Sequence, residues 1–278
     1  MGIELNMLNI NFEGNLNLWE LLDFAIEHNI DIYELLHTAL IKEVLFTEEQ
    51  KLLSNFIESV GDKNKIIKSQ LLQDAFASFI VGDLFDKTFL EFGATDGISL
   101  SNSYMLENNF GWTGILAEPS PQWYEALKNN RPNTEIITDC IWKSSGEKLD
   151  FFVSDIGILS TLVDFKHSDL DSMPGNTEAR IQDGKVVEVN TISINDVMEK
   201  NFNGNAPSYL SIDTEGSEYE ILKSLDFEKY RPIVFTIEHN YTNLENKIDE
   251  LMTSKGYIRV FRRITAFDAW YVRTDAIK

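Results

Sequence analysis

The stretch TFLEFGATDGISLSNSYMLENNFGWTGILAEP, residues 88–119, decides the fold of this protein. It opens with an apolar run that contains Glu91, passes through a turn of small residues, and closes with a second apolar run that ends in Glu118. A segment with helical character separates the two runs. Strand, turn, helix and strand in this order predict a unit of a parallel sheet with a right-handed crossover.

The same alternation continues toward the C-terminus. Short apolar segments, typical of strands buried in a parallel sheet, recur at 88–93, 114–118, 135–140, 149–154, 186–192, 209–213, 233–238 and 259–263. Predicted helices separate many of them, at 100–109, 121–130, 193–201, 217–225 and 243–255. Residues 155–185 have little periodicity, and a connector of this length is often a lid or a binding loop. The pattern over 69–278 predicts an α/β fold with a mostly parallel, seven-stranded twisted sheet and helices on both faces.

The N-terminal part of the chain has a different pattern. Residues 16 to about 85 place apolar side chains at helical spacing. Asn17, Asp31 and Thr47 are each followed three residues later by Glu or Gln, which is the spacing of a capping box at a helix start. We therefore expect residues 1–68 to form a helical region that packs outside the sheet as a separate cap. Such helices are also a possible surface for a homo-oligomer.

Composition and charge limit the functions that this chain can have. Its 278 residues are 43% hydrophobic and carry a formal net charge of −21, which is compatible with a folded domain. The acidic excess repels phosphates at long range and argues against nucleic acid as the main partner. No apolar run reaches the roughly 18 residues that a membrane span needs, and no signal peptide is evident. Because Cys140 is the single cysteine, nothing indicates an oxidising compartment, and we expect a cytoplasmic protein.

The turn after the first strand predicts a ligand site. Its spacing, from Gly93 to Gly97 with three residues between them, differs from the glycine pattern of dinucleotide sites. Small residues allow close approach of the backbone to a ligand, and the next helix offers free N–H groups. Glu91 and Asp96 suit a cationic ligand better than a pyrophosphate, so Asp96 is expected to lie at the cofactor. Glu118, at the end of the second strand, is placed to accept hydrogen bonds from a ribose diol.

The end of the third predicted strand completes this site. Asp139 is followed by Cys140, Ile141 and Trp142, and a polar atom beside flat apolar side chains suits an adenine ring. The three strand ends thus predict an adenosine-shaped site with carboxylates and without a phosphate clamp. The cofactor that fits is S-adenosylmethionine (SAM), which has a sulfonium cation and no phosphate.

Two further strand ends carry groups suited to catalysis. The strand at 209–213 ends in Asp213, and Glu215 follows it. The strand at 233–238 ends in Glu238, and His239 and Asn240 follow it. In an open α/β sheet both ends face the cofactor crevice. In one alternative His239 accepts a hydroxyl proton, oriented by Glu215 or Glu238. In the other, Asp213 and Glu238, with Asn240, hold Mg²⁺ against the acceptor oxygen. Asp213 takes part in both.

Four segments resemble the FkbM family of SAM-dependent methyltransferases. They are SQLLQD at 69–74, the block at 89–121, NNR at 129–131 and LSIDTEGSEYEIL at 210–222. The resemblance covers about residues 69–273. It implies a Rossmann-like class I methyltransferase fold, SAM as the cofactor, and O-methylation of a sugar, a glycan or a related metabolite with a hydroxyl group.

The resemblance also implies which residues hold the cofactor. Those expected around its methionine part are Glu91, Gly93, Ala94 and Gly97, with Ser101 and Asn102 as donors to its carboxylate. Those expected around its ribose and adenine are Glu118, Pro119, Ser120 and Asp139.

Two functions of other classes stay open. One is a non-catalytic ligand- or protein-binding module on a methyltransferase fold, and the intact acidic sets at the strand ends argue against it. The other is a nicotinamide-dependent sugar oxidoreductase, and the missing glycine spacing argues against that. The sequence does not identify the acceptor, because acceptors are held by loops such as 155–185, whose chemistry varies freely on one fold.

Overall fold

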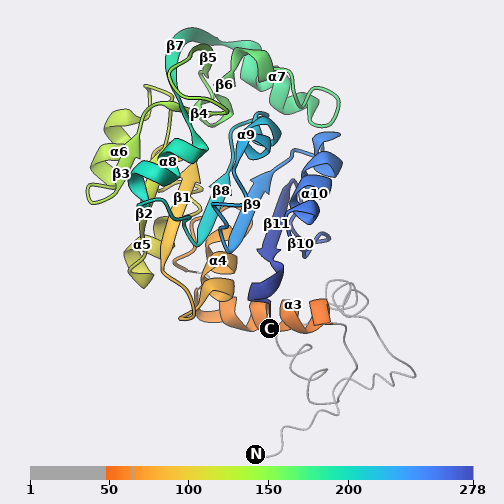
Figure 1. The fold of residues 1–278 in the computed structure, drawn as a ribbon. Helices are drawn as coiled ribbons and strands as arrows, with labels where there is room; N and C mark the ends of the chain where they lie inside the picture. The colour runs from red at the N-terminus through yellow and green to blue at the C-terminus, as the bar shows by residue number, and fades with distance from the viewer. Residues whose placement is uncertain (1–47, 64, 278) are drawn as a thin grey trace, which may run out of the picture. The chain divides into compact units, whose positions relative to one another are not determined.

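The computed structural model describes residues 48–63 and 65–277 (Figure 1). The chain divides into two compact units, Met1–Asp62 and Lys63–Lys278. Helix α3 (Glu48–Val60) belongs to the first unit. The helix starts expected at Asn17, Asp31 and Thr47 lie outside the described residues, and the domain boundary at 68–69 stays a prediction.

A seven-stranded sheet forms the centre of the second unit. Its strands follow the order β10-β11-β9-β8-β1-β2-β3. They are β1 (Thr88–Phe92), β2 (Thr113–Ala117), β3 (Glu135–Ile137), β8 (Tyr209–Ile212), β9 (Val234–Glu238), β10 (Tyr257–Val260) and β11 (Asp268–Arg273). Neighbours from β3 to β9 run parallel, whereas β11 is antiparallel to both β9 and β10. The mostly parallel, seven-stranded sheet expected from the sequence is therefore confirmed.

Helices cover both faces of this sheet (Figure 1). They are α4 (Gln73–Val81), α5 (Tyr104–Phe110), α6 (Tyr124–Asn130), α8 (Ile194–Asn201), α9 (Glu218–Ser224) and α10 (Leu244–Ser254). Strands β8 and β9 are buried along their whole length, because both faces of a central parallel strand are covered. None of the helices in the described part of the chain is long and apolar enough to cross a membrane.

A second, four-stranded sheet is present in addition to the predicted seven-stranded one. Its order is β4-β7-β5-β6, and its strands are β4 (Cys140–Trp142), β5 (Lys148–Ser154), β6 (Thr161–Leu162) and β7 (Gly184–Ser193). The stretch 135–140, predicted as one strand, ends at Ile137 in the main sheet and supplies Cys140 to the second. Strands β5 and β7 pair antiparallel with each other, so they form a local sheet instead of inserting between parallel neighbours.

The segment predicted to be an irregular loop contains regular structure. Helix α7 (Pro174–Gln182) lies between β6 and β7, and short 3₁₀ turns precede it at Gly157–Leu159 and Val163–Phe165. At the C-terminal end, the strand predicted at 259–263 is β10 and ends at Val260. Strand β11 was not predicted, although its register pairs Asp268 with Glu238. That pairing completes the sheet next to the end of β9.

Candidate active site

One cavity of about 250 Å³ lies at the carboxyl ends of β1, β2, β8 and β9. Its opposite wall comes from the second sheet and from the segment between β5 and α7, including Phe151, Ile158, Leu162 and Met173. Carboxyl ends of parallel strands are where open α/β sheets bind their ligands. The two sheets thus enclose a site at the position that the sequence predicts.

Most of the predicted site residues line this cavity, and several do not. The lining includes Glu91, Gly93, Ser101, Asn102, Glu118, Pro119, Asp213, Glu215, Glu238 and Asn240. Six expected residues do not line it, namely Ala94, Asp96, Gly97, Ser120, Asp139 and His239. The structure therefore does not place these six residues at the wall of the cavity.

Glu118 presents a buried carboxylate to the cavity. Its Oε2 accepts a hydrogen bond from the backbone N–H of Thr95 at 2.8 Å, and its Oε1 accepts one from the N–H of Ser120 at 2.8 Å. Burial raises the pKa of Glu118 to about 7, against the effect of these two N–H groups. Each oxygen retains a second lone pair, so the carboxylate can accept two hydroxyl groups of a ribose. Ser120 orients Glu118 through its backbone N–H and does not itself line the cavity.

Glu91 organises the loop that follows β1. Its Oε1 accepts the backbone N–H of Asn102 at 2.7 Å, and its Oε2 accepts the hydroxyls of Ser101 at 3.1 Å and of Ser103. Burial raises the pKa of Glu91, and Arg131 opposes that effect. Glu91 therefore acts on a ligand mainly by holding Ser101 and Asn102 in place.

Asn102 offers an acceptor in addition to the donor that was expected. Its Nδ2 donates to the hydroxyl of Ser211 at 2.9 Å, so one of its two amide N–H groups is occupied. Its Oδ1 is buried and has no hydrogen-bond partner within the described part of the chain. The Ser101 hydroxyl is likewise occupied, because it donates to Glu91 and accepts the N–H of Tyr104 at 3.1 Å. An unpaired carbonyl oxygen in this place fits the ammonium group of a methionine moiety.

Asp96 and Gly97, which do not line the cavity, belong to the turn after β1. The carboxylate of Asp96 accepts the N–H groups of Ile98 at 2.8 Å and Ser99 at 2.7 Å, so it caps its own turn and does not face a ligand. A Cβ on Gly97 would lie 2.6 Å from the Cδ1 of Leu127, which shows that this glycine is required for packing against α6.

Ala94 and Asp139 were also expected to contact the cofactor and do not line the cavity. Ala94 is buried and donates its N–H to the carbonyl of Ala117 at 3.3 Å. Asp139 stands between β3 and β4, and the next two residues, Cys140 and Ile141, line the cavity in its place. An adenine ring at this edge of the cavity would meet apolar atoms and no carboxylate of Asp139.

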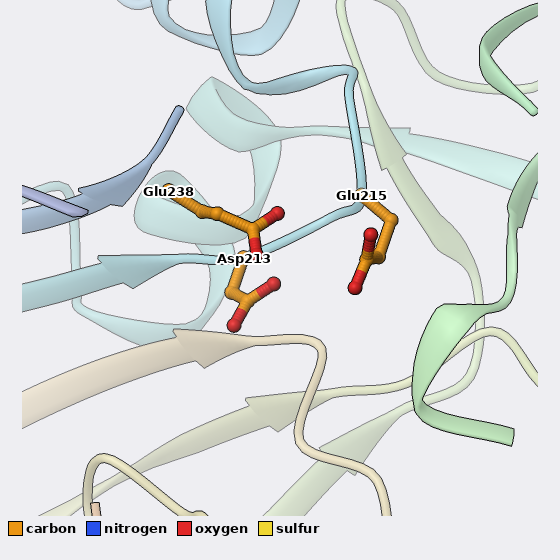
Figure 2. A group of neighbouring side chains, drawn as sticks. All are labelled: Asp213, Glu215 and Glu238. Atoms are coloured by element: carbon orange, nitrogen blue, oxygen red, sulfur yellow. The ribbon is translucent and has the colours of Figure 1, made fainter. Parts of the chain in front are cut away.

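Three carboxyl groups meet at the ends of β8 and β9. Asp213, Glu215 and Glu238 each offer an oxygen, and these oxygens lie within 4.8 Å of one another. Figure 2 shows the three side chains converging from two neighbouring strand ends. Glu215 has a positive φ of 59°, a conformation that non-glycine residues seldom adopt. The turn after β8 thus holds Glu215 in a position that an ordinary helix start would not produce.

Burial and mutual repulsion dominate the electrostatics of this cluster. Burial raises the pKa of Asp213 well above its usual value, and the charges of Glu215 and Glu218 add to the effect. The pKa of Glu238 is raised in the same way, by burial and by Asp213. Neither Asp213 nor Glu238 has a hydrogen-bond or ion-pair partner for its carboxylate within the described residues. Both groups are therefore available to a bound molecule.

Glu215 differs from the other two because it has a buried cation. The Nη2 of Arg180 donates to its Oε2 at 2.5 Å, and both side chains are almost entirely buried. Burial raises the pKa of Glu215 to about 7, and Arg180 opposes the shift. This pairing is not evident from the sequence, because Arg180 lies on α7, in the segment predicted to be a loop.

His239 is turned away from the cavity, so its predicted role as the base is not supported by its position. Its Nδ1 accepts the N–H of Tyr241 at 3.1 Å, and its Nε2 lies 3.2 Å from the carbonyl oxygen of Asp268. Burial lowers its pKa. Both ring nitrogens are engaged outside the cavity, whereas the preceding residue, Glu238, faces into it.

The carboxylate cluster has ligand atoms that suit a metal ion. Carboxylate oxygens are ligands that hard cations such as Mg²⁺ prefer, and the structure joins Glu215 to the predicted pair Asp213 and Glu238. Asn240 lines the same cavity. The residues thus fit an oxygen-bound divalent cation in chemistry, although Glu215 already commits one oxygen to Arg180.

The fold and the cavity together define a class I methyltransferase, with a mostly parallel seven-stranded sheet whose carboxyl edge holds the site. A family model for the methyltransferase FkbM domain matches residues 91–259. This is more than half of the chain, and the protein belongs to the FkbM methyltransferase family. Use of SAM follows from that membership.

Solved structures with a related fold have low sequence identity to this chain. A crystal structure of methyltransferase FkbM from Methylobacillus flagellatus KT is 12% identical, with a TM-score of 0.41, and the match covers 80% of this chain and 59% of that one. The O-methyltransferase from Bacillus cereus in complex with SAH is 13% identical, with a TM-score of 0.37 and coverages of 78% and 89%. No curated protein matches the chain in sequence.

Proposed function

We propose that this protein is a SAM-dependent O-methyltransferase that acts on a hydroxyl group of a sugar, a glycan or a related metabolite. The observation that carries the proposal is the shared cavity of Glu118, Asp213 and Glu238. Glu118 suits a ribose, and the two other carboxylates have no partner among the described residues. A nucleoside cofactor and a hydroxyl acceptor therefore both find matching groups in one enclosed space.

The cofactor is held by acceptor groups of the chain. Glu118 accepts the ribose hydroxyls, and Asn102 Oδ1 accepts the ammonium group of the methionine part. Bound SAM supplies a methyl group already activated on a sulfonium, so no covalent enzyme intermediate is required. The chain has to orient the acceptor oxygen in line with that methyl group and to exclude water.

Asp213 is the proton acceptor in this proposal. Its carboxylate takes the proton of the acceptor hydroxyl while the oxygen forms its bond to the methyl carbon and the carbon–sulfur bond breaks. A carboxyl group whose pKa is raised by burial is a stronger base than an exposed one. Glu238 accepts a hydrogen bond from a neighbouring hydroxyl of the acceptor, and Glu215 is held beside Asp213 and Glu238 by Arg180.

Calorimetry and a transfer assay test the function. SAM and SAH are expected to bind in the micromolar range, and NAD is expected not to bind. Asp213→Asn should lower methyl transfer from tritium-labelled SAM to hydroxyl acceptors by about 10²-fold or more and leave SAM affinity nearly unchanged. Binding of NAD in place of SAM would indicate an oxidoreductase. SAM binding with no transfer to any acceptor would favour the non-catalytic module.

A divalent cation is the alternative use of the same cluster. Asp213 and Glu238, with Glu215 or Asn240, would hold Mg²⁺, which lowers the pKa of a hydroxyl group. Titration of the apoprotein with Mn²⁺, followed by electron paramagnetic resonance, tests this route without an acceptor. Saturable binding that is lost in Glu238→Gln would support it, and methyl transfer that survives exhaustive chelation would exclude it.

The remaining features of the proposal follow from charge and composition. A net charge of −21 favours a small-molecule or glycan acceptor over nucleic acid. The single cysteine, Cys140, is a buried free thiol, which suits the cytoplasm. A homo-oligomer formed through the N-terminal helices stays a prediction, because most of that region lies outside the described residues.

A further inference from the structure

The charges around the cavity restrict which acceptor can enter it. We infer that the acceptor carries no phosphate, sulfate or carboxylate at the end that is methylated, and that this end is an uncharged or amine-bearing hydroxyl compound. The inference rests on the proposed function and goes beyond it by naming the charge class of the acceptor. Three sets of contacts support it.

The first set is the lining itself. Five acidic side chains face the cavity: Glu91, Glu118, Asp213, Glu215 and Glu238. No Lys, Arg or His side chain is part of the lining, as far as the described residues extend. A buried anion without a cationic partner is strongly disfavoured. Protonation of some of these carboxyl groups removes repulsion, but it does not supply a positive charge.

The second set concerns Arg180 and Arg131, two buried arginines that contact residues of the cavity wall. The guanidinium of Arg180 donates to the carbonyls of Leu159 and Lys166 and to the carboxylates of Asp169 and Glu215. These five contacts use all five of its N–H groups. Arg180 therefore stabilises the wall of the cavity and has nothing left for an acceptor anion.

Arg131 is occupied in the same way on the other side of the site. It donates to the carboxylate of Glu107, the carbonyl of Gly97 and the hydroxyls of Ser101 and Ser103. Its side chain is fully buried. Neither arginine can reach a phosphate or carboxylate in the cavity without breaking contacts that hold the walls together.

The third set is the backbone. N–H groups at the turns before helices commonly bind anions in α/β folds. Here the N–H groups of Thr214 and Gly216 donate to the carboxylate of Glu218, at 2.8 and 3.0 Å. In the first turn, the N–H of Thr95 donates to Glu118. Carboxylates of the chain itself therefore occupy these anion-binding positions.

Three acceptor groups of the cavity lining have no partner within the described residues. They are the Oδ1 of Asn102 and the carboxylates of Asp213 and Glu238. Hydroxyl and ammonium groups supply the donors that they need. The side chains of the described lining supply no positive charge that could balance an acceptor anion.

Cofactor analogues test this charge preference without knowledge of the acceptor. The probes are SAM and two analogues in which the transferred methyl is replaced by CH₂–COO⁻ or by the uncharged isostere CH₂–CONH₂. Each probe places its substituent in the acceptor space. Isothermal titration at pH 8 should show that the carboxylate analogue binds at least tenfold more weakly than the amide analogue. Because the two substituents have nearly the same size, the difference reports charge.

Variants of the cavity residues identify which carboxyl groups cause the weaker binding of the carboxylate analogue. Asp213→Asn and Glu238→Gln should each reduce the ratio between the two analogues several-fold. Glu125→Gln is the control, because Glu125 is an exposed carboxylate on α6 that does not line the cavity, and it should leave the ratio unchanged. If the protein binds SAM but has equal affinities for the two analogues, this inference is wrong and the proposed function is not affected. Absence of SAM binding would overturn the proposed function as well.

Discussion

Arg180 on helix α7 and Glu215 in the turn after β8 form a buried ion pair, with 2.5 Å between Nη2 and Oε2. The same guanidinium makes a second ion pair with Asp169 at 2.7 Å. Together these contacts join the segment between β5 and β7 to the carboxylate cluster at the end of the main sheet. The geometry of the cavity therefore depends on a side chain that faces away from the ligand space.

Loss of this guanidinium should strongly destabilise the fold. Arg180→Met leaves Asp169 and Glu215 buried without their cation, and breaking a buried pair in this way typically costs about 3–5 kcal/mol. Urea unfolding followed by circular dichroism measures the change. Lys229→Met is the control, because Lys229 forms an exposed pair with Glu199 and its loss should have little effect. Equal stability of the two variants would contradict the structural role of Arg180.

Glu118 should contribute strongly to cofactor affinity. A charge-assisted hydrogen bond contributes about 1.5–3 kcal/mol, so Glu118→Ala should weaken SAM binding by roughly tenfold or more. Isothermal titration measures the affinity, and Glu125→Ala, an exposed change on α6, serves as the control. Unchanged affinity in Glu118→Ala would place the ribose elsewhere.

Gly93 should tolerate no side chain, for a reason that goes beyond its backbone conformation. Gly93 and Gly146 have similar positive φ angles, 74° and 81°. A Cβ on Gly93 would lie 2.0 Å from the carbonyl oxygen of Asp213, whereas one on Gly146 meets nothing within 4 Å. Gly146→Ala should therefore cost about 1 kcal/mol in unfolding free energy, and Gly93→Ala at least twice as much. Comparable losses would show that β1 and β8 do not approach each other so closely.

The stability of the protein without ligand should fall as pH rises through neutrality. Burial raises the pKa of Glu118 and of Asp268 to about 7 in the folded state. In the unfolded chain both carboxyl groups ionise near pH 4, so the folded state holds their protons more tightly. Their contribution is complete below pH 4 and is lost as pH approaches 7, and each shift corresponds to about 3–4 kcal/mol. Carboxyl groups with lowered pKa values, such as Asp169, titrate below this window.

Thermal unfolding between pH 5.5 and 8 measures this effect. The melting temperature should be higher at pH 5.5 than at pH 8. Glu118→Gln and Asp268→Asn should each flatten the dependence, because an amide does not ionise. A melting temperature that increases toward pH 8 would mean that these groups are not buried as the structure shows.

The main sheet was predictable because its strands carry a local signal. Residues 88–119 contain apolar runs of strand length around a helical segment, and both faces of such strands have to be covered. The second sheet was not predictable in this way. Strands β5 and β7 have the same kind of apolar run, and only their antiparallel pairing with each other separates them from the parallel layer.

Within the site, the residue types at the strand ends were predictable from the sequence. Which of these side chains point into the cavity was not. Glu118, Asp213 and Glu238 line the cavity as the sequence indicates. His239 has the right chemistry at the right strand end, yet adjacent residues of an extended chain point in opposite directions, and Glu238 takes the position facing the cavity. Asp96 shows a similar effect, because its carboxylate is used by N–H groups of its own turn.

The sequence by itself determined the βαβ unit, the acidic ends of four strands and the family of the protein, because these features depend on neighbouring residues. The tertiary structure alone decided how those ends are combined. Arg180 reaches Glu215 across 35 residues, Glu218 occupies the N–H groups of the turn after β8, and Asn102 is left with an unpaired oxygen. Each of these depends on which side chains folding brings within hydrogen-bond distance, and spacing along the chain does not encode that distance.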